Sequence, residues 1–170
     1  MPQTQVYQNQ AAGIYGELYD NSPIRARALI LRSASAANNV FGRAFTIVAG
    51  QEGVAQAGGT TPFAGYLINP KAHASFGTSV GGPLASTLTL PNEVVADILN
   101  MGCIYTYLPA AAAVGDLVVY NTTTGALATI APGAVVPGGF AYGYATVDQF
   151  PVTAAGIAII RVTAVPAIPA

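Results

Sequence analysis

The chain has 170 residues, of which 6 are basic and 7 acidic, and 52% of its residues are hydrophobic. Charged residues make up 8% of the chain, against about 25% in an ordinary soluble domain, so the composition argues against a free monomer. The net charge of −1 leaves no basic field for a phosphate backbone, and nucleic-acid binding is therefore not expected.

Residues 1–23 form a polar, glutamine-rich segment with too few large apolar side chains for a core of its own. This composition predicts an extended arm that becomes ordered on a partner, with a frayed terminus as the equal alternative. Tyr7, Tyr15 and Tyr19 lie in the arm, and tyrosine is enriched at interfaces because it offers rigid contact area and one hydrogen bond. The first residues lack the features of a signal peptide, so we expect synthesis in a cytoplasm.

Residues 24–170 are predicted to form one β domain, because short apolar runs alternate with glycine, proline and asparagine. The first strands are expected over 25–32, 41–48 and 63–68. The segments 33–39, 51–62 and 71–87 are predicted to be loops, since they are small, polar or rich in glycine.

The segment from residue 92 to 108 permits two interpretations. Asn92 could cap a helix that ends at Gly102. Alternatively, a strand over 93–99 turns at residues 100–102 into a second strand over 103–108, and we favour this hairpin because its second half is plainly strand-like. Cys103 lies in this apolar stretch; as the single cysteine it excludes an internal disulfide, and we expect a small buried hydrophobe there.

The C-terminal third predicts a hairpin of residues 117–120 and 126–130, followed by strands over 140–147 and 156–162. The uncharged stretch between Asp116 and Asp148 is long enough to cross a bilayer, but its prolines and glycines exclude a membrane-spanning helix, so no membrane partner is expected. The predicted class is all-β: a small β-barrel, a sandwich or a β-tulip-like domain with an extended N-terminal arm.

No pattern in the sequence predicts a catalytic or metal site. His73 is the only histidine and no nucleophile elbow accompanies it. One histidine and one cysteine cannot supply a zinc tetrad, and the carboxylates are dispersed, with Glu93 and Asp97 as a close pair. Phosphate-binding glycine motifs are also absent from the sequence. We therefore expect no enzyme and no cofactor.

The ordered set of motifs resembles the structural cement proteins, the head decoration proteins of tailed phages. The similar segments are the opening Gln3-Thr4-Gln5-Val6-Tyr7-Gln8, the Gly16-Glu17 pair, the Asn21-Ser22-Pro23 step, the strand 39–45 with Gly42-Arg43, the turns 114–116 and 124–127, and the closing strand 156–162. The Asn-Pro step carries one extra residue here.

This resemblance implies a virion protein that binds the outer face of a phage head and stabilises contacts between capsomers. Its implied partners are the major capsid protein and further copies of itself, as a homotrimer. The residues expected to contact partners are Gln3, Gln5, Tyr7, Gln8, Tyr15, Tyr19, Arg25 and Arg27. Because six of the 13 charged residues lie within the first 43 residues, we expect this part to meet the shell and the apolar remainder to form the β body and self-contacts.

Three alternatives remain open from the sequence. The chain could be another phage structural component, such as a tail-tube, head-completion or fibre protein, or a small major shell subunit. A carbohydrate-binding β module is less favoured, because the chain has no tryptophan for a sugar-stacking platform.

Overall fold

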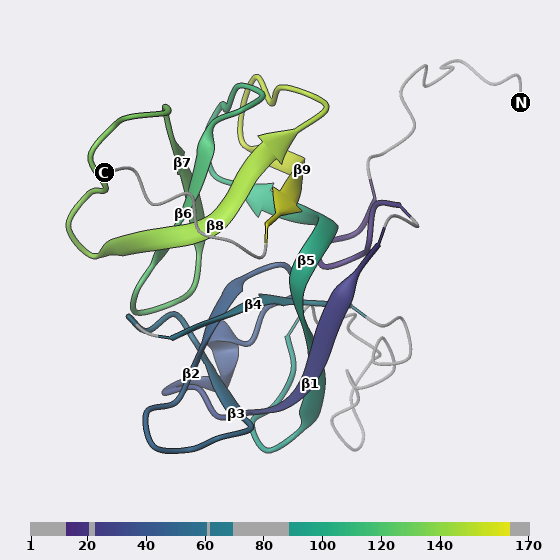
Figure 1. Ribbon diagram of the computed structural model, residues 1–170, viewed down its shortest axis with the longest axis vertical. Coiled ribbons are helices and arrows are strands. Elements are labelled where there is room, and N and C mark those ends of the chain that lie inside the picture. Colours follow the sequence, from purple (N-terminus) through teal and green to yellow (C-terminus); the bar gives the residue numbers. More distant parts are fainter. Residues whose placement is uncertain (1–12, 21–22, 61, 70–88, 164–170) are drawn as a thin grey trace, which may run out of the picture.

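The computed structural model describes residues 13–20, 23–60, 62–69 and 89–163 (Figure 1). Within these ranges the chain forms nine β-strands and one 3-10 turn over Ala36–Asn38. The all-β class predicted from the sequence is therefore confirmed. The strands divide between a small closed barrel, drawn in purple and blue, and a second sheet, drawn in green and yellow.

The barrel contains β1 (Arg25–Leu31), β2 (Ala44–Ile47), β3 (Val54–Ala57), β4 (Phe63–Leu67) and the first half of β5 (Val95–Leu108). The strands follow the order β1-β3-β2-β4-β5, and an additional antiparallel pairing of β1 with β5 closes the ring. Only the β1–β3 pairing is parallel; the other pairings of the barrel are antiparallel. Closure removes the free strand edges that an open sheet would expose.

The second sheet continues from the other half of β5 in the order β5-β9-β8-β6-β7. It consists of β6 (Leu117–Asn121), β7 (Leu127–Ile130), β8 (Phe140–Asp148) and β9 (Gly156–Val162), all paired antiparallel. The hairpin predicted near residues 117–130 is confirmed by the β6–β7 ladder. In this sheet β7 is the terminal strand.

The hairpin predicted around residues 100–102 is wrong, because β5 runs without a turn from Val95 to Leu108. Its first half pairs with β1 as far as Met101, and its second half pairs with β9 from Gly102 onward. Gly102 has a φ of +131°, which lets the strand bend where it leaves the barrel. Residues 100–102 therefore mark the point where β5 changes from one set of partner strands to another. The local sequence does not distinguish such a change of partners from a turn. The helix alternative is also excluded.

Two hydrophobic cores result from the alternation of side chains along the shared strands. Leu67 and Ile98 are paired across β4 and β5 and belong to the core inside the barrel, while the neighbouring pair Tyr66 and Leu99 belongs to the core under the second sheet. Successive side chains of a strand point to opposite faces. Strands β4 and β5 therefore serve both cores at once.

Strand β3 was not predicted, since the segment 51–62 was expected to be a glycine-rich connection. Its four residues Val54–Ala57 include two alanines and a glutamine, which have little strand preference of their own. Pairing with β1 on one side and β2 on the other makes them a strand. The loop predicted over 71–87 and His73 lie outside the described residues.

Candidate interaction surface

Residues 13–20, the described part of the predicted arm, lie along the second half of β5. The amide of Gly16 donates to the Tyr105 carbonyl at 2.8 Å, the Tyr105 amide donates to Glu17 at 2.9 Å, and Tyr19 donates to Cys103 at 3.0 Å. Gly16 has a φ of +81°, and an added Cβ would press on Phe41 and Asn69. A side chain at position 16 would thus be strained and obstructed, which explains why glycine occupies the first position of the Gly16-Glu17 pair.

The two described arm tyrosines pack edge-to-face on tyrosines of β5. The ring centroids of Tyr15 and Tyr107 are 5.8 Å apart, and those of Tyr19 and Tyr105 are 5.5 Å apart. The Tyr19 hydroxyl also donates to Oε1 of Gln149 at 2.6 Å. Such aromatic pairs add about 0.5–1.5 kcal/mol beyond the area that they bury. Tyr15 and Tyr19 thus hold the arm to its own chain and stay half-buried.

The remaining residues expected to contact partners lie apart from these tyrosines. Arg25 and Arg27 are exposed at the start of β1, and Nε of Arg25 donates to Oδ1 of Asn100 at 2.8 Å. Gln3, Gln5, Tyr7 and Gln8 lie outside the described residues. A role for all eight residues in partner binding stays a prediction.

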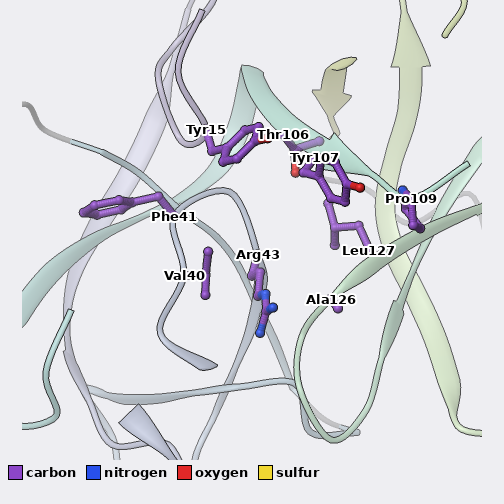
Figure 2. Close-up of a pocket in the computed structure, with 9 residues that line it drawn as sticks. All are labelled: Tyr15, Val40, Phe41, Arg43, Thr106, Tyr107, Pro109, Ala126 and Leu127. Carbon is purple, nitrogen blue, oxygen red and sulfur yellow. The ribbon is translucent and has the colours of Figure 1, made fainter. Parts of the chain in front are cut away.

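A cavity of about 330 Å³ lies between the arm, the barrel and the second sheet (Figure 2). Its walls come from the arm, the segment before β2, the end of β5 and the start of β7; the lining residues are Tyr15, Val40, Phe41, Arg43, Thr106, Tyr107, Pro109, Ala126 and Leu127. Most of the lining is apolar. Tyr107 and Pro109 are exposed, so the cavity can be reached from solvent.

Arg43 supplies the positive charge of this cavity. Its Nη1 donates to the Thr124 carbonyl at 3.2 Å and to Oδ1 of Asn38 at 3.4 Å. Partial burial lowers the pKa of the guanidinium from its usual value. All seven acidic residues of the chain lie in the described ranges, and none of them pairs with Arg43. The charge is therefore balanced only by neutral oxygens.

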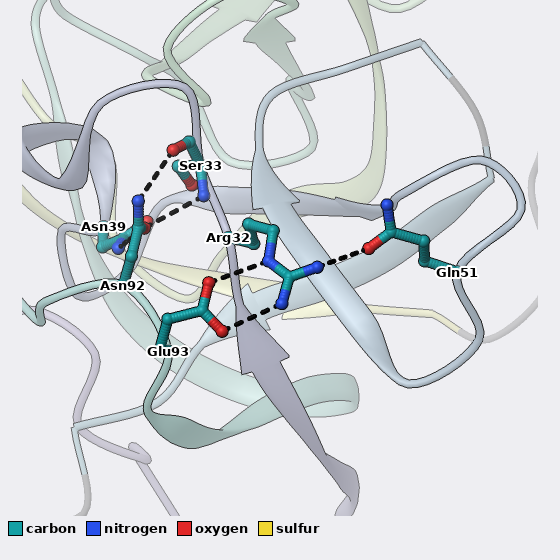
Figure 3. Close-up of polar contacts among 6 residues, drawn as sticks. All are labelled: Arg32, Ser33, Asn39, Gln51, Asn92 and Glu93. Atoms are coloured by element: carbon teal, nitrogen blue, oxygen red, sulfur yellow. Dashed lines mark hydrogen bonds and ion pairs between the residues drawn. The ribbon is translucent and has the colours of Figure 1, made fainter.

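A second polar cluster lies where β1 ends and β5 begins (Figure 3). Arg32 makes two parallel bonds to Glu93, with Nε–Oε1 at 2.8 Å and Nη2–Oε2 at 2.9 Å, and a third bond to Gln51 at 2.7 Å. The side-chain hydrogen bond from Arg32 lowers the pKa of the Glu93 carboxyl. These side chains join β1 to the turns beside it, so we assign the pair a structural role.

Asn39 and Asn92 extend this cluster inward. Nδ2 of Asn39 donates to Oδ1 of Asn92 at 2.9 Å and to the Leu90 carbonyl at 3.0 Å, while Asn92 exchanges two bonds with the backbone of Ser33. Asn39 is fully buried, and its Oδ1 has no hydrogen-bond partner among the described residues. The network fixes the chain before β5 against the end of β1.

No catalytic constellation is visible in the described ranges. Cys103 is buried, and burial, with the nearby charge of Asp20, raises the pKa of its thiol, which disfavours the nucleophilic thiolate. Within the same ranges no group of three His, Cys, Asp or Glu side chains is placed to hold a metal ion. A helix with the length and apolarity to span a bilayer is likewise not found there.

Sequence reasoning missed the cavity and its charge. Gly42-Arg43 was noted as part of a motif, but Arg43 was not selected as a site residue. The sequence does mark this residue, because Arg43 is the single charged residue in an apolar, strand-like run. Tyr107, which no motif in the sequence singles out, is 46% exposed and lines that cavity. The approach of β7 to the end of β5, which forms the wall, is a property of the tertiary structure alone.

Comparison with known proteins gives one family and several solved chains of similar fold. Residues 2–163 match the family model described as structural cement protein (E217 gp24/Pam3 gp6). A chain in a solved structure entitled "The capsid of Myoviridae Phage XM1" is similar over 94% of this chain and 95% of its own, with a TM-score of 0.59 and 19% identity. A comparison with curated proteins finds no significant match. Because the family model spans nearly the whole sequence, the chain belongs to the phage structural cement protein family.

Proposed function

We propose that this protein is a capsid cement protein, which binds the outer surface of a phage head and stabilises contacts between capsomers. The observation that carries this function is the match of residues 2–163 to the cement family. The fold shared with a chain of a phage capsid structure supports it. The major capsid protein is the partner that this role requires, and the virion is the location.

The physical character of the chain suits such a role. A protein with 6 basic and 7 acidic residues has few charged side chains to keep its surface hydrated and the protein soluble as a monomer. Binding in many copies to a repeating shell lets modest individual contacts add up through effective concentration. The protein acts as a structural component without catalysis, and its copies associate as a homotrimer on the shell.

Residues 1–23 act as the arm that attaches the protein to the shell, and residues 24–170 form the β body. The hydrogen bonds of residues 16–19 to β5 support this division, with residues 13–20 as the base of the arm along β5. The residues before this base, including Gln3, Gln5, Tyr7 and Gln8, then reach the shell. Arg25 and Arg27 lie beside the base and add positive charge.

The test compares the full chain with a variant that lacks residues 2–12. Each is mixed with shells assembled from the major capsid protein alone, and the bound fraction is measured by co-sedimentation. We expect the full chain to bind and the truncation to lose most binding while its circular dichroism and melting temperature stay unchanged. Full binding by the truncation would contradict the role of the arm, and no binding by the full chain would contradict the cement function.

A further inference from the structure

Among the described residues, one stretch of β5 has no backbone partner on the side opposite β9. Tyr105 directs its N–H and C=O toward the arm, as its bonds to Gly16 and Glu17 show. In an antiparallel strand every second residue points its backbone groups to the same side, so Tyr107 points the same way. The arm turns away at Ile14–Glu17, where the Glu17 amide donates to the Ile14 carbonyl at 3.0 Å, and no described residue bonds the backbone of Tyr107 on that side.

The outer edge of β7 likewise carries backbone groups that no described residue bonds. Asn121 donates to Ala126 at 2.8 Å at the turn of the β6–β7 hairpin. By the same alternation Ala128 and Ile130 bond to β6, while Leu127 and Thr129 point their backbone groups outward. Among the described residues none bonds these outward groups. Such an edge can accept an added strand.

These two edges meet at the cavity that contains Arg43. Tyr107 and Leu127 both line it, and Figure 2 shows their side chains next to each other, with the Arg43 guanidinium in another part of the lining. We call the outward edge of β7 (Leu127–Ile130), together with Tyr107 of β5 and the cavity that Tyr107 and Leu127 line, the seam. It combines unpaired strand edges, an apolar pocket and a cation without a carboxylate.

The acidic residues of the chain show that a second copy is poorly suited to fill the seam. Glu93 and Asp148 are paired with arginines, Asp116 accepts the Ala113 amide, and the arm carboxylates Glu17 and Asp20 have partners. The exposed Glu52 lies in the tight turn that joins β2 to β3. Asp97 lies within β5, between β1 and the backbone of Ile68. Neither can enter the seam as an extended strand.

We propose that the seam receives an extended segment of the major capsid protein, which places an apolar side chain in the cavity and a nearby carboxylate against Arg43. The segment adds to the edge of β7 through main-chain hydrogen bonds, and the pocket and the charge select its sequence. This proposal rests on the cement function. It gives the protein a second attachment point, on the body rather than on the arm.

The test measures binding to shells of the major capsid protein for four variants. Arg43→Gln removes the charge and Arg43→Lys keeps it. Thr129→Pro removes an outward N–H, and Thr129→Val is its matched control because it retains that group. We expect Arg43→Gln to weaken binding roughly ten- to a hundredfold, the range for one charge-assisted hydrogen bond, and Thr129→Pro to weaken it by up to about tenfold, the range for a neutral backbone hydrogen bond. Arg43→Lys should lose less, and Thr129→Val should bind as the wild type does.

Two further readouts separate docking from misfolding. Melting temperatures identify any variant that has lost its fold, and the binding of Arg43→Gln should depend less steeply on salt than that of the wild type. A photo-crosslinking benzoylphenylalanine in place of Tyr107 should attach to a capsid-protein peptide that contains Asp or Glu. Mass spectrometry of the crosslinked shells identifies that peptide.

The possible results have distinct meanings. Crosslinks to a second copy of this chain or to residues 1–12 would overturn the proposal, as would wild-type affinity of both Arg43→Gln and Thr129→Pro. In each of these cases the wild type still binds shells, so the cement function stands. If the wild type itself fails to bind, the cement function falls and the seam proposal falls with it.

Discussion

The barrel and the second sheet share β5, but among the described strands the barrel has no free edge whereas the second sheet ends in one. In the barrel β1 pairs with β5 and closes the ring, so that its strands have partners on both sides. In the second sheet β7 pairs with β6 alone, and its other edge faces the cavity. A closed ring resists further strand pairing, whereas an open edge invites it. The difference indicates that the barrel supports the fold and that the second sheet is suited to assembly.

The charged residues are also distributed unevenly between the barrel and the second sheet. The strands and turns of the barrel contain Arg25, Arg27, Arg32, Arg43, Glu52, Glu93 and Asp97, while the chain after residue 108 contains only Asp116, Asp148 and Arg161. The ion pair of Arg161 with Asp148, at 2.9 Å, joins β8 to β9. The second sheet therefore presents a mostly uncharged surface, which costs little to cover with another protein.

The largest expected effect comes from the barrel core. Phe45 is fully buried inside the barrel, and Phe45→Ala should lower the free energy of unfolding by about 3–5 kcal/mol. Because β5 belongs to both regions, we expect one cooperative unfolding transition in urea. Near- and far-ultraviolet circular dichroism should report the same midpoint for it. Val135→Ala, at a residue 90% exposed, is the control and should change nothing. Two separate transitions would show that the regions fold independently.

A smaller effect should come from the contact that joins the regions. Tyr66 of β4 is fully buried, and its hydroxyl donates to the carbonyl of Gly143 in β8 at 2.6 Å. Tyr66→Phe leaves that carbonyl without its donor and should cost about 1–3 kcal/mol in urea unfolding. Tyr107→Phe, which alters an exposed tyrosine, is the matched control. Equal stability of Tyr66→Phe and the wild type would show that this hydrogen bond does not stabilise the contact between the barrel and the second sheet.

The same variant has a pH signature. Burial, with a smaller contribution from Tyr120, raises the pKa of Tyr66 well above 10, and burial with Tyr144 raises the pKa of Tyr120 to about 12. The unfolded chain loses these protons near pH 10 while the folded chain keeps them. This stability is therefore complete below about pH 10 and is lost as the pH rises toward 12 and beyond. Urea midpoints between pH 8 and 12 should fall less steeply for Tyr66→Phe.

The smallest effect is expected at the exposed ion pair of the barrel. Arg32 and Glu93 are about half exposed, with side-chain exposures of 47% and 60%, so water and salt screen their attraction. Arg32→Gln should cause a small loss of stability that disappears in 1 M NaCl. Because the pKa of Glu93 is lowered, the contribution is present above its unfolded value and fades as the pH falls below about 4. A loss unchanged by salt would show that packing, not charge, is responsible.

Local patterns predicted the strands whose residues favour strands by themselves. Residues 156–162, with three isoleucines and a valine, and the hairpin around residues 121–126 belong to this group. β3 was missed because alanine and glutamine form a strand there only between β1 and β2. The turn expected at residues 100–102 failed for a related reason, since β5 exchanges one set of partners for another at that point.

The all-β class, the sparse charge and the family motifs can be recognised in the amino-acid sequence, because composition and short-range order are present in the chain before it folds. The folded structure is needed to show that β1 closes on β5, that the Tyr66 hydroxyl joins β4 to β8, and that Arg43 shares a cavity with Tyr107 and Leu127. These contacts join residues far apart in the chain. Their geometry depends on strand register and sheet curvature, which no local pattern encodes.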